Sequence, residues 1–338
     1  MFTPLSTVAR LGIVAFAIVI LGLPLVVQAP YILHLLILSM LFALLSCSWN
    51  LITGWAGLKT FGHQAFFAIG AYVSALVAKD AHLTPWLTIW LGGLAASVFG
   101  LIVALPVLRI RSMPHVAIVT LGFAEIVRVV ISNLKDVTRG ELGLWGIPAF
   151  TGFHLPGYGD VVFNAAVKVP YYYTMAVLFL GGLGILGLFV RSRIGLAIVA
   201  MRDAQDAAES LGVNLTRHKL AVFSLGAFIA GVCGAFYAHY ILLLTPDAVA
   251  DLDVMILILS MTLVGGLGTF FGPVAGAFVL TLGVESLRGL GDYRMLIYGA
   301  GILAIVLVLP KGLSSIADLA TGWRRPIARP VAADRPSG

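Results

Sequence analysis

Charged residues are scarce in this sequence. Asp, Glu, Lys and Arg together make up 11% of the 338 residues, whereas soluble globular domains carry about 25%. Apolar residues make up 60% of the chain, and its mean hydropathy is +1.04. This composition excludes an ordinary water-soluble protein and places most of the chain in lipid.

The sequence also lacks the alternation of apolar and polar residues that is typical of membrane β-barrels, whose strands have roughly ten residues each. Its apolar runs are unbroken. A segment in lipid must satisfy its backbone groups internally, which an α-helix does. The sequence therefore predicts an all-α integral membrane protein, in which the Gly- and Ala-rich stretch 226–235 is suited to close contact between helices.

Cysteine is rare, and the histidines are isolated. Cys47 and Cys233 each lie inside an apolar run and give neither a disulfide framework nor metal-ligand spacing, so we expect them to pack as small apolar side chains. The basic residues flank the apolar runs and do not form the patch that nucleic-acid binding needs. We therefore expect no metal site, no cofactor and no nucleic-acid partner.

Ten apolar segments are candidates for membrane spans, because a crossing needs about 20 residues, with a range of about 17–25. They cover residues 11–27, 31–53, 65–78, 85–108, 114–133, 171–190, 220–244, 254–264, 273–287 and 295–309. The eighth and ninth segments are short, and Gly265, Gly266 and Gly268 fall between them. We predict two abbreviated spans there, joined by a tight turn.

The distribution of Lys and Arg predicts the orientation, because cytoplasmic loops are rich in these residues. With ten spans and a cytoplasmic N-terminus, fourteen Lys and Arg residues lie inside and six outside. This arrangement predicts a membrane domain at 1–310, with a cytoplasmic loop at 191–219 and an outer loop at 134–170. The polar tail at 311–338 is then cytoplasmic, and we expect it to be poorly ordered. The first segment is longer than the apolar core of a signal peptide, about 7–15 residues, so we expect it to be retained.

The cytoplasmic loop contains the most informative polar segment, residues 195–212, which read GLAIVAMRDAQDAAESLG. Residues 203–211 are rich in good helix formers, and Gly212 stands where a helix would end. A short helix outside the membrane, between two spans, is suited to being gripped by another protein; the alternative is an amphipathic connector. The residues expected at this contact are Arg202, Asp203, Asp206, Ala207, Ala208, Glu209 and Gly212.

One motif in this loop resembles a known family. Asp206-Ala207-Ala208, followed after three residues by Gly212, is similar to the EAA-x-x-x-G signature of ABC importer permeases, with Asp in place of Glu. Further stretches resemble the branched-chain amino acid permeases of the LivM type, in the same order along the chain. They are WNLITGWAGLKTFGHQAFFAIGAY (49–72), AIVTLGFAEIVR (117–128), TRGELGLWGIP (138–148), residues 202–238, VGGLGTFFGPVAGA (264–277) and PKGL (310–313).

This resemblance covers most of the chain between residues 49 and 313. It departs from the family pattern at Thr60 and Gln64, at residues 113–115, and at Arg139 and Glu141 in the outer loop. The resemblance therefore does not fix the solute.

The resemblance implies the permease fold of an ABC importer for branched-chain or related amino acids, in the inner membrane of a bacterium. It implies three kinds of protein partner: a second permease subunit, identical or different, two cytoplasmic ATP-binding subunits and a periplasmic substrate-binding protein. The sequence agrees, because GWAGLKT (54–60) lacks the Gly-Lys-Thr adjacency of a phosphate-binding loop. We expect a transport subunit that is not an enzyme, with ATP bound by its partners.

Polar residues beside broken helices are candidates for the transport path, because unwound backbone in a membrane is tolerated only where protein or a cavity surrounds it. Asn50, His63 and Gln64 flank such a break; the alternative is hydrogen bonding between helices. Glu125 and Arg128 lie three residues apart and either meet a zwitterion or pair with each other. The remaining candidates are Thr120 and the glycines of the breaks, Gly54, Gly57, Gly62, Gly265, Gly266 and Gly268.

Three other functions remain open at this point. A permease of the same family that carries urea, short amides or aromatic acids fits the same features. An ion-coupled secondary transporter should show carboxylates at the bilayer midplane, and only Glu125 competes for that role. A membrane-embedded enzyme needs a nucleophile and a base together, and the sequence shows no such cluster.

Overall fold

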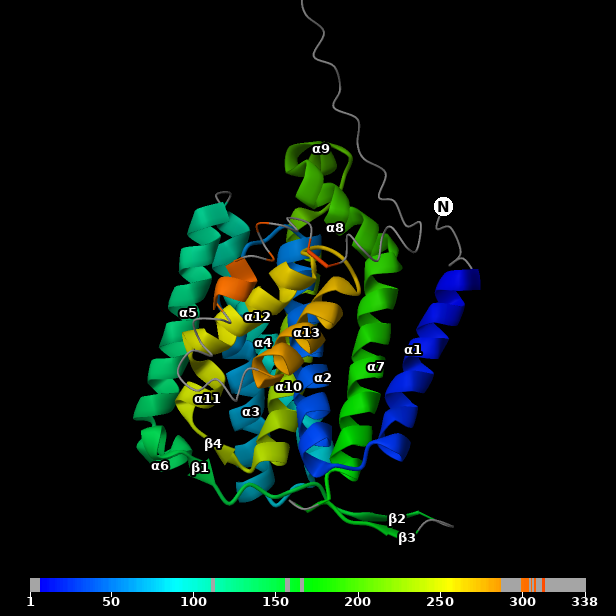
Figure 1. The fold of residues 1–338 in the computed structure, drawn as a ribbon. Coiled ribbons are helices and arrows are strands. Elements are labelled where there is room, and N and C mark those ends of the chain that lie inside the picture. The colour runs from blue at the N-terminus through cyan, green and yellow to red at the C-terminus, as the bar shows by residue number, and fades with distance from the viewer. Residues whose placement is uncertain are drawn as a thin grey trace, which may run out of the picture.

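A computed structural model describes residues 7–110, 113–155, 159–164 and 167–286, and residues 299–303, 305, 307, 312 and 313. These residues are mostly helical, as predicted (Figure 1). The helices are α1 (Thr7–Val26), α2 (Pro30–Asn50), α3 (His63–Asp80), α4 (Pro85–Arg109), α5 (Met113–Asn133), α6 (Lys135–Thr138), α7 (Val169–Arg191), α8 (Arg193–Asp203), α9 (Gln205–Ser210), α10 (Leu215–Ile241), α11 (Pro246–Ala250), α12 (Leu252–Gly265) and α13 (Gly272–Ser286).

Proline defines where several helices begin. Pro30, Pro85 and Pro246 are the first residues of α2, α4 and α11. Proline is favoured at this position, since its fixed φ suits the first turn and its missing N–H would have no partner within the helix. A π-helical turn, η1 (Leu51–Trp55), continues α2 before the chain unwinds ahead of α3.

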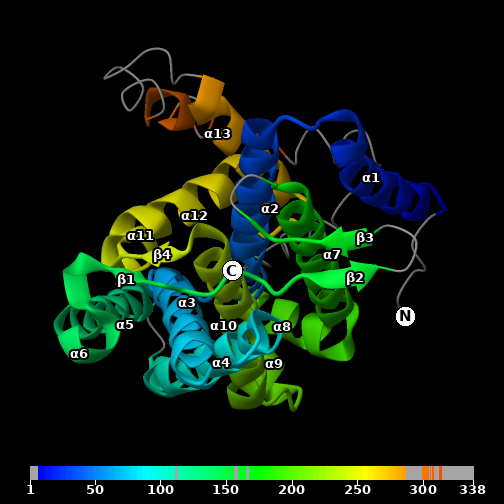
Figure 2. The same cartoon turned by 90° about the horizontal axis from the view of Figure 1, so that it is seen from below.

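Helix α10 lies at the centre of the bundle, packed against α3 and α4 (Figure 2). Glycine makes this packing close. A Cβ on Gly234 would lie 1.9 Å from the Phe67 carbonyl oxygen, and one on Gly70 would lie 2.1 Å from the Gly231 carbonyl oxygen. The prediction of close helix contact at 226–235 is therefore confirmed.

Six helical segments of the described chain are long and apolar enough to cross a membrane. They are Pro30–Trp55, Pro85–Arg109, Pro114–Asn133, Val169–Arg191, Leu215–Ile241 and Pro246–Gly265. The last of these corrects the sequence analysis: α11 precedes α12, and together they provide 20 residues where 254–264 suggested a short span. Helix α13 has 15 residues and is short as predicted. Most of the expected tenth span, 295–309, and nearly all of the tail, 311–338, lie outside the described residues.

Successive long helices run in opposite directions, so their connections alternate between the two ends of the bundle (Figure 1). One end carries α8 and α9. The other end carries α6, the 3-10 turn η2 (Gly140–Leu142) and four short strands, β1 (Leu144–Trp145), β2 (Phe153–Leu155), β3 (Gly159–Val161) and β4 (Leu243–Leu244). The predicted inner and outer loops thus lie at opposite ends.

The loop at the second end is folded. β1 pairs antiparallel with β4, and β2 pairs antiparallel with β3. The Arg139 guanidinium lies 4.0 Å from the centre of the Trp145 ring. His239 Nδ1 is 2.8 Å from the Pro148 carbonyl oxygen, which ties the loop to the end of α10.

Candidate coupling and transport site

Helices α8 and α9 form a handle that projects beyond the ends of the long helices (Figure 1). The Ser192 side chain caps α8 by accepting a hydrogen bond from the Gly195 N–H, 3.3 Å. Ala204 is extended, with φ −155° and ψ 92°, and separates the two helices. The short helix expected over 203–211 is α9, and Asp203 is the last residue of the preceding helix, α8.

Gly212 ends α9 as predicted. Its φ is +85°, a left-handed conformation that glycine adopts without steric cost. Its N–H donates to the Glu209 carbonyl, 2.9 Å, and the Val213 N–H donates to the Ala208 carbonyl, 3.0 Å. These bonds satisfy carbonyls that the end of a helix leaves without partners.

The tip of the handle is exposed. Asp206, Ala207 and Glu209 are exposed, whereas Ala208 is buried against the rest of the handle. Leu211 is 85% exposed and was missing from the predicted contact residues. An apolar side chain directly before the helix-ending glycine was the signal that could have indicated it.

Arg202 connects the handle to the membrane bundle. Its Nη1 donates to the Gly54 carbonyl oxygen, 3.1 Å, and its Nε donates to Asp203 Oδ1, 2.9 Å. Gly57, at φ +75°, faces the Arg202 side chain, where a Cβ would lie 2.6 Å from Arg202 Cγ. Two groups of predicted residues, the loop and the broken turn, therefore meet at Arg202.

The two glycine-rich breaks also meet each other. Asn50 Nδ2 donates to the Thr269 carbonyl, 2.7 Å, and Asn50 Oδ1 accepts from the Gly268 N–H, 2.7 Å. A Cβ on Gly54 would lie 2.5 Å from the Gly268 nitrogen. The Asn50 amide thus fastens the turn after α2 to the turn between α12 and α13, and it is 2% exposed.

The other predicted polar residues of this region are buried. His63 Nε2 lies 2.7 Å from Ser48 Oγ, and Thr120 Oγ1 accepts from the Phe61 N–H, 3.0 Å. His63 Nδ1 and Gln64 Oε1 have no hydrogen-bond partner among the described residues. The sequence left open whether such groups line the path or join helices; Asn50, His63 and Thr120 join segments here.

A small cavity lies beside the first break. Thr60, Gly62 and Thr120 line it together with apolar side chains, and its volume is about 10 Å³. Within the part of the chain that the structure describes, Thr60 Oγ1 has no hydrogen-bond partner. A space of this size has room for roughly one water molecule. An amino acid does not fit there, so a passage for one needs a larger space than this cavity.

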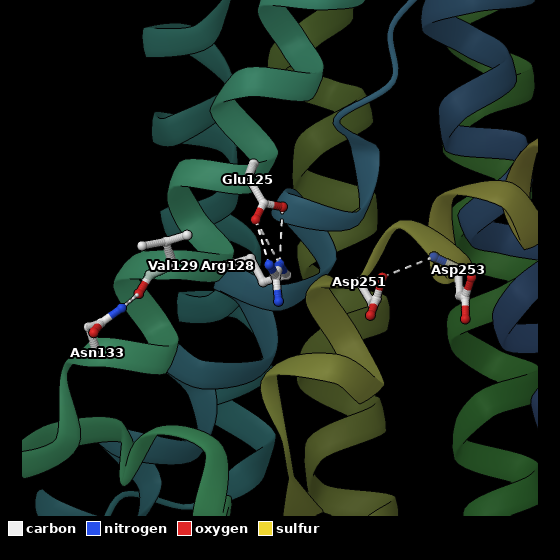
Figure 3. Close-up of polar contacts among 6 residues, drawn as sticks. All are labelled: Glu125, Arg128, Val129, Asn133, Asp251 and Asp253. Carbon is white, nitrogen blue, oxygen red and sulfur yellow. Dashed lines mark hydrogen bonds and ion pairs between the residues drawn. The ribbon is translucent and has the colours of Figure 1, made fainter.

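Glu125 and Arg128 form an exposed ion pair on α5 (Figure 3). Arg128 Nη2 lies 2.6 Å from Glu125 Oε1, and the side chains of Arg128 and Glu125 are 35% and 55% exposed. Asp247 and Asp251, in α11 and at the start of α12, are close enough to interact electrostatically with Arg128. In the apolar segment of α5, 28% of the residues are buried, compared with 67% of those in the apolar segment of α10. The pair therefore lies on a face of the bundle that the described residues leave uncovered.

Comparison with known proteins gives consistent matches. A family model described as the permease component of branched-chain amino acid transport systems matches residues 31–307. The high-affinity branched-chain amino acid transport system permease protein LivM of Salmonella typhimurium is 31% identical over 295 residues, which cover 82% of this chain and 68% of that protein. The LivM protein of Escherichia coli is 30% identical over 323 residues, covering 90% and 74%.

A second type of permease is also similar. The LivH permease protein of Escherichia coli is 24% identical over 285 residues, covering 80% of this chain and 90% of that protein. No solved structure matches the chain.

Proposed function

This chain belongs to the family of permease components of branched-chain amino acid transport systems, and we propose that it forms one side of the path of an ATP-driven importer for branched-chain or related amino acids. A permease component is a transport subunit and not an enzyme. Two cytoplasmic ATP-binding subunits supply the energy, a second permease subunit completes the path, and a periplasmic protein delivers the solute.

This proposal depends on the handle formed by α8 and α9. It offers a partner an exposed apolar side chain, Leu211, beside the exposed carboxylates of Asp206 and Glu209. Central apolar contacts with a charged rim are typical of protein interfaces. A helix held at both ends by the membrane bundle transmits a movement of the ATP-binding subunits to the spans.

We test this contact with two substitutions in the handle, Gly212→Pro and Asp206→Arg. Proline fixes φ near −65°, whereas Gly212 has φ +85° and donates its N–H to Glu209. Asp206→Arg reverses an exposed charge. Both variants should reach the membrane in normal amounts and lose the ATP-binding subunits during purification through a tag on the permease.

Asp136→Arg is the matched control, because it reverses an exposed charge on α6 at the other end of the bundle. It should keep the ATP-binding subunits. Intact complexes with both handle variants would contradict the proposed contact.

The face of α5 that carries Glu125 and Arg128 is the argument for a second permease subunit. A charged pair inside a membrane span is costly where it meets lipid, and such residues usually face the bundle interior, a partner or water. Among the described residues, Glu125 is exposed and Arg128 is half-buried, so we assign that face to the second subunit and the path between the two chains. The pair then offers an anion and a cation to the zwitterionic backbone of an amino acid.

The alternatives in the sequence analysis fit this geometry less well. A carboxylate that binds a coupling ion must be available to it, whereas Glu125 accepts three hydrogen-bond contacts from Arg128, between 2.6 and 3.1 Å. Arg139, where the sequence departs from the family pattern, stacks on Trp145 and shapes the outer loop. It therefore gives no reason to replace the amino acid with urea or an amide.

A further inference from the structure

The contact between Arg202 and Gly54 exists because the helix before it is irregular. In a continued α-helix, the Leu58 N–H would bond the Gly54 carbonyl. Here the Leu58 N–H bonds the Ile52 carbonyl, 3.1 Å, and the Ala56 N–H bonds the Leu51 carbonyl, 3.1 Å. The π-helical turn thus leaves the Gly54 carbonyl available to Arg202, and such turns occur frequently at functional sites.

Glycine makes room for this contact on both sides. Gly57 leaves space for the stem of Arg202, since a Cβ there would lie 2.6 Å from Arg202 Cγ. Gly54 packs against the second break, where its own Cβ would lie 2.5 Å from the Gly268 nitrogen. The guanidinium is held from the handle side by Asp203, with Nη2 and Oδ1 2.9 Å apart.

The turn that Arg202 holds contacts two other parts of the bundle. Asn50 binds it to the turn between α12 and α13 through Gly268 and Thr269. At its other end, the Phe61 N–H donates to Thr120 Oγ1 on α5. Helix α5 also carries Glu125 and Arg128. A displacement of α8 that moves Gly54 therefore acts on both the second break and the helix with the exposed ion pair.

We propose that Arg202 is the positioning residue that couples the handle to the path, by holding the π-helical turn through the Gly54 carbonyl. This proposal rests on the proposed function of the handle as the contact for the ATP-binding subunits. Without the contact, the handle still binds those subunits, but its movement no longer reaches the turn. ATP is then hydrolysed with little transport.

The test uses the complete importer in proteoliposomes, with its ATP-binding subunits and its solute-loaded binding protein. Arg202→Ala should keep the ATP-binding subunits and most of the ATP hydrolysis, while the solute imported per ATP falls about tenfold or more. Arg202→Lys should restore part of that ratio, because an ammonium group donates to the carbonyl but lacks the planar fork that also reaches Asp203. Arg109→Ala, which removes an exposed charge at the same end of the bundle on α4, should leave the ratio unchanged.

A second variant changes the glycine that makes room for the Arg202 side chain. Gly57→Ala should push Arg202 from its place and lower the ratio, and the double variant Gly57→Ala, Arg202→Ala should be no worse than Arg202→Ala alone. Additive losses would overturn the proposal, because the two residues would then act independently.

Two further outcomes would also overturn it. An unchanged ratio in Arg202→Ala would show that the contact transmits nothing. Loss of the ATP-binding subunits from Arg202→Ala would make Arg202 a docking residue. Both outcomes leave the proposed function intact. The proposed function fails instead if Gly212→Pro and Asp206→Arg both keep the ATP-binding subunits.

Discussion

At the scale of single residues, glycine determines how closely the central helices approach. Gly234 on α10 meets the backbone of α3, where a Cβ would lie 1.9 Å from the Phe67 carbonyl oxygen and 3.0 Å from the Ala71 nitrogen. Backbone atoms cannot turn away as a flexible side chain does. The approach of α10 to α3 therefore depends on the missing side chain.

Gly234→Ala should destabilise the protein by about 1–3 kcal/mol, the usual cost of overpacking a close contact. Gly184→Ala on α7 is the control, because a Cβ there meets nothing within 4 Å; it should leave stability unchanged or slightly higher, since alanine favours a helix. Thermal unfolding of the purified protein in detergent measures both. Equal melting temperatures for the two variants would contradict the close contact.

Some residues showed their roles in the sequence and others did not. Gly212 was predicted to end a helix because glycine adopts a left-handed backbone easily, and its φ of +85° confirms this. Asn50 was singled out as a polar group beside a break, but its amide holds Gly268, more than two hundred residues away. Periodicity and local composition do not reveal which distant turns meet, so that partner and the Arg202 contact required the structure.

At the scale of elements, hydropathy located the long helices well because each span must close its own backbone bonds in lipid. It failed where polar residues interrupt a span. Asp247, Asp251 and Asp253 hid the connection of α11 to α12, so the eighth segment looked short. Gly54 marked a break at this place, but the π-helical turn itself was missed, because no residue pattern distinguishes it from an ordinary helix end.

Helix α5 is the element whose role is most open to a direct test. If the exposed pair meets the amino acid in the path, Glu125→Gln should lower uptake about tenfold, since hydrogen bonds to charged groups contribute about 1.5–3 kcal/mol. The ATP-binding subunits should remain attached, because Glu125 lies in the half of α5 nearer to α6, and α6 and the handle lie at opposite ends of the bundle (Figure 1). Uptake of the radiolabelled solute into vesicles measures the effect.

The control for α5 is Glu141→Gln, which neutralises an exposed carboxylate in the outer loop and should leave uptake near normal. Unchanged uptake in Glu125→Gln would favour the simpler interpretation, in which Glu125 and Arg128 only neutralise each other.

At the scale of the whole molecule, the chain has a handle at one end and a folded loop at the other (Figure 1), and α5 carries an ion pair, Glu125 and Arg128. The sequence predicted the class of the molecule, because low charge and long apolar runs leave few alternatives. It did not predict which face stays uncovered. That depends on how helices pack in three dimensions, and α5 is little buried although, like its neighbours, it is long and apolar enough to cross a membrane.

The orientation of the two ends in the membrane is a prediction from the Lys and Arg distribution, and two matched cysteine variants test it. Leu142 in the outer loop is 88% exposed and Leu211 on the handle is 85% exposed. The native Cys47 and Cys233 are buried, so they add little background. In spheroplasts that overproduce the permease, a membrane-impermeant maleimide should label Leu142→Cys at once and Leu211→Cys only after the membrane is permeabilised. Labelling of Leu211→Cys in intact spheroplasts would place the handle outside, out of reach of cytoplasmic ATP-binding subunits.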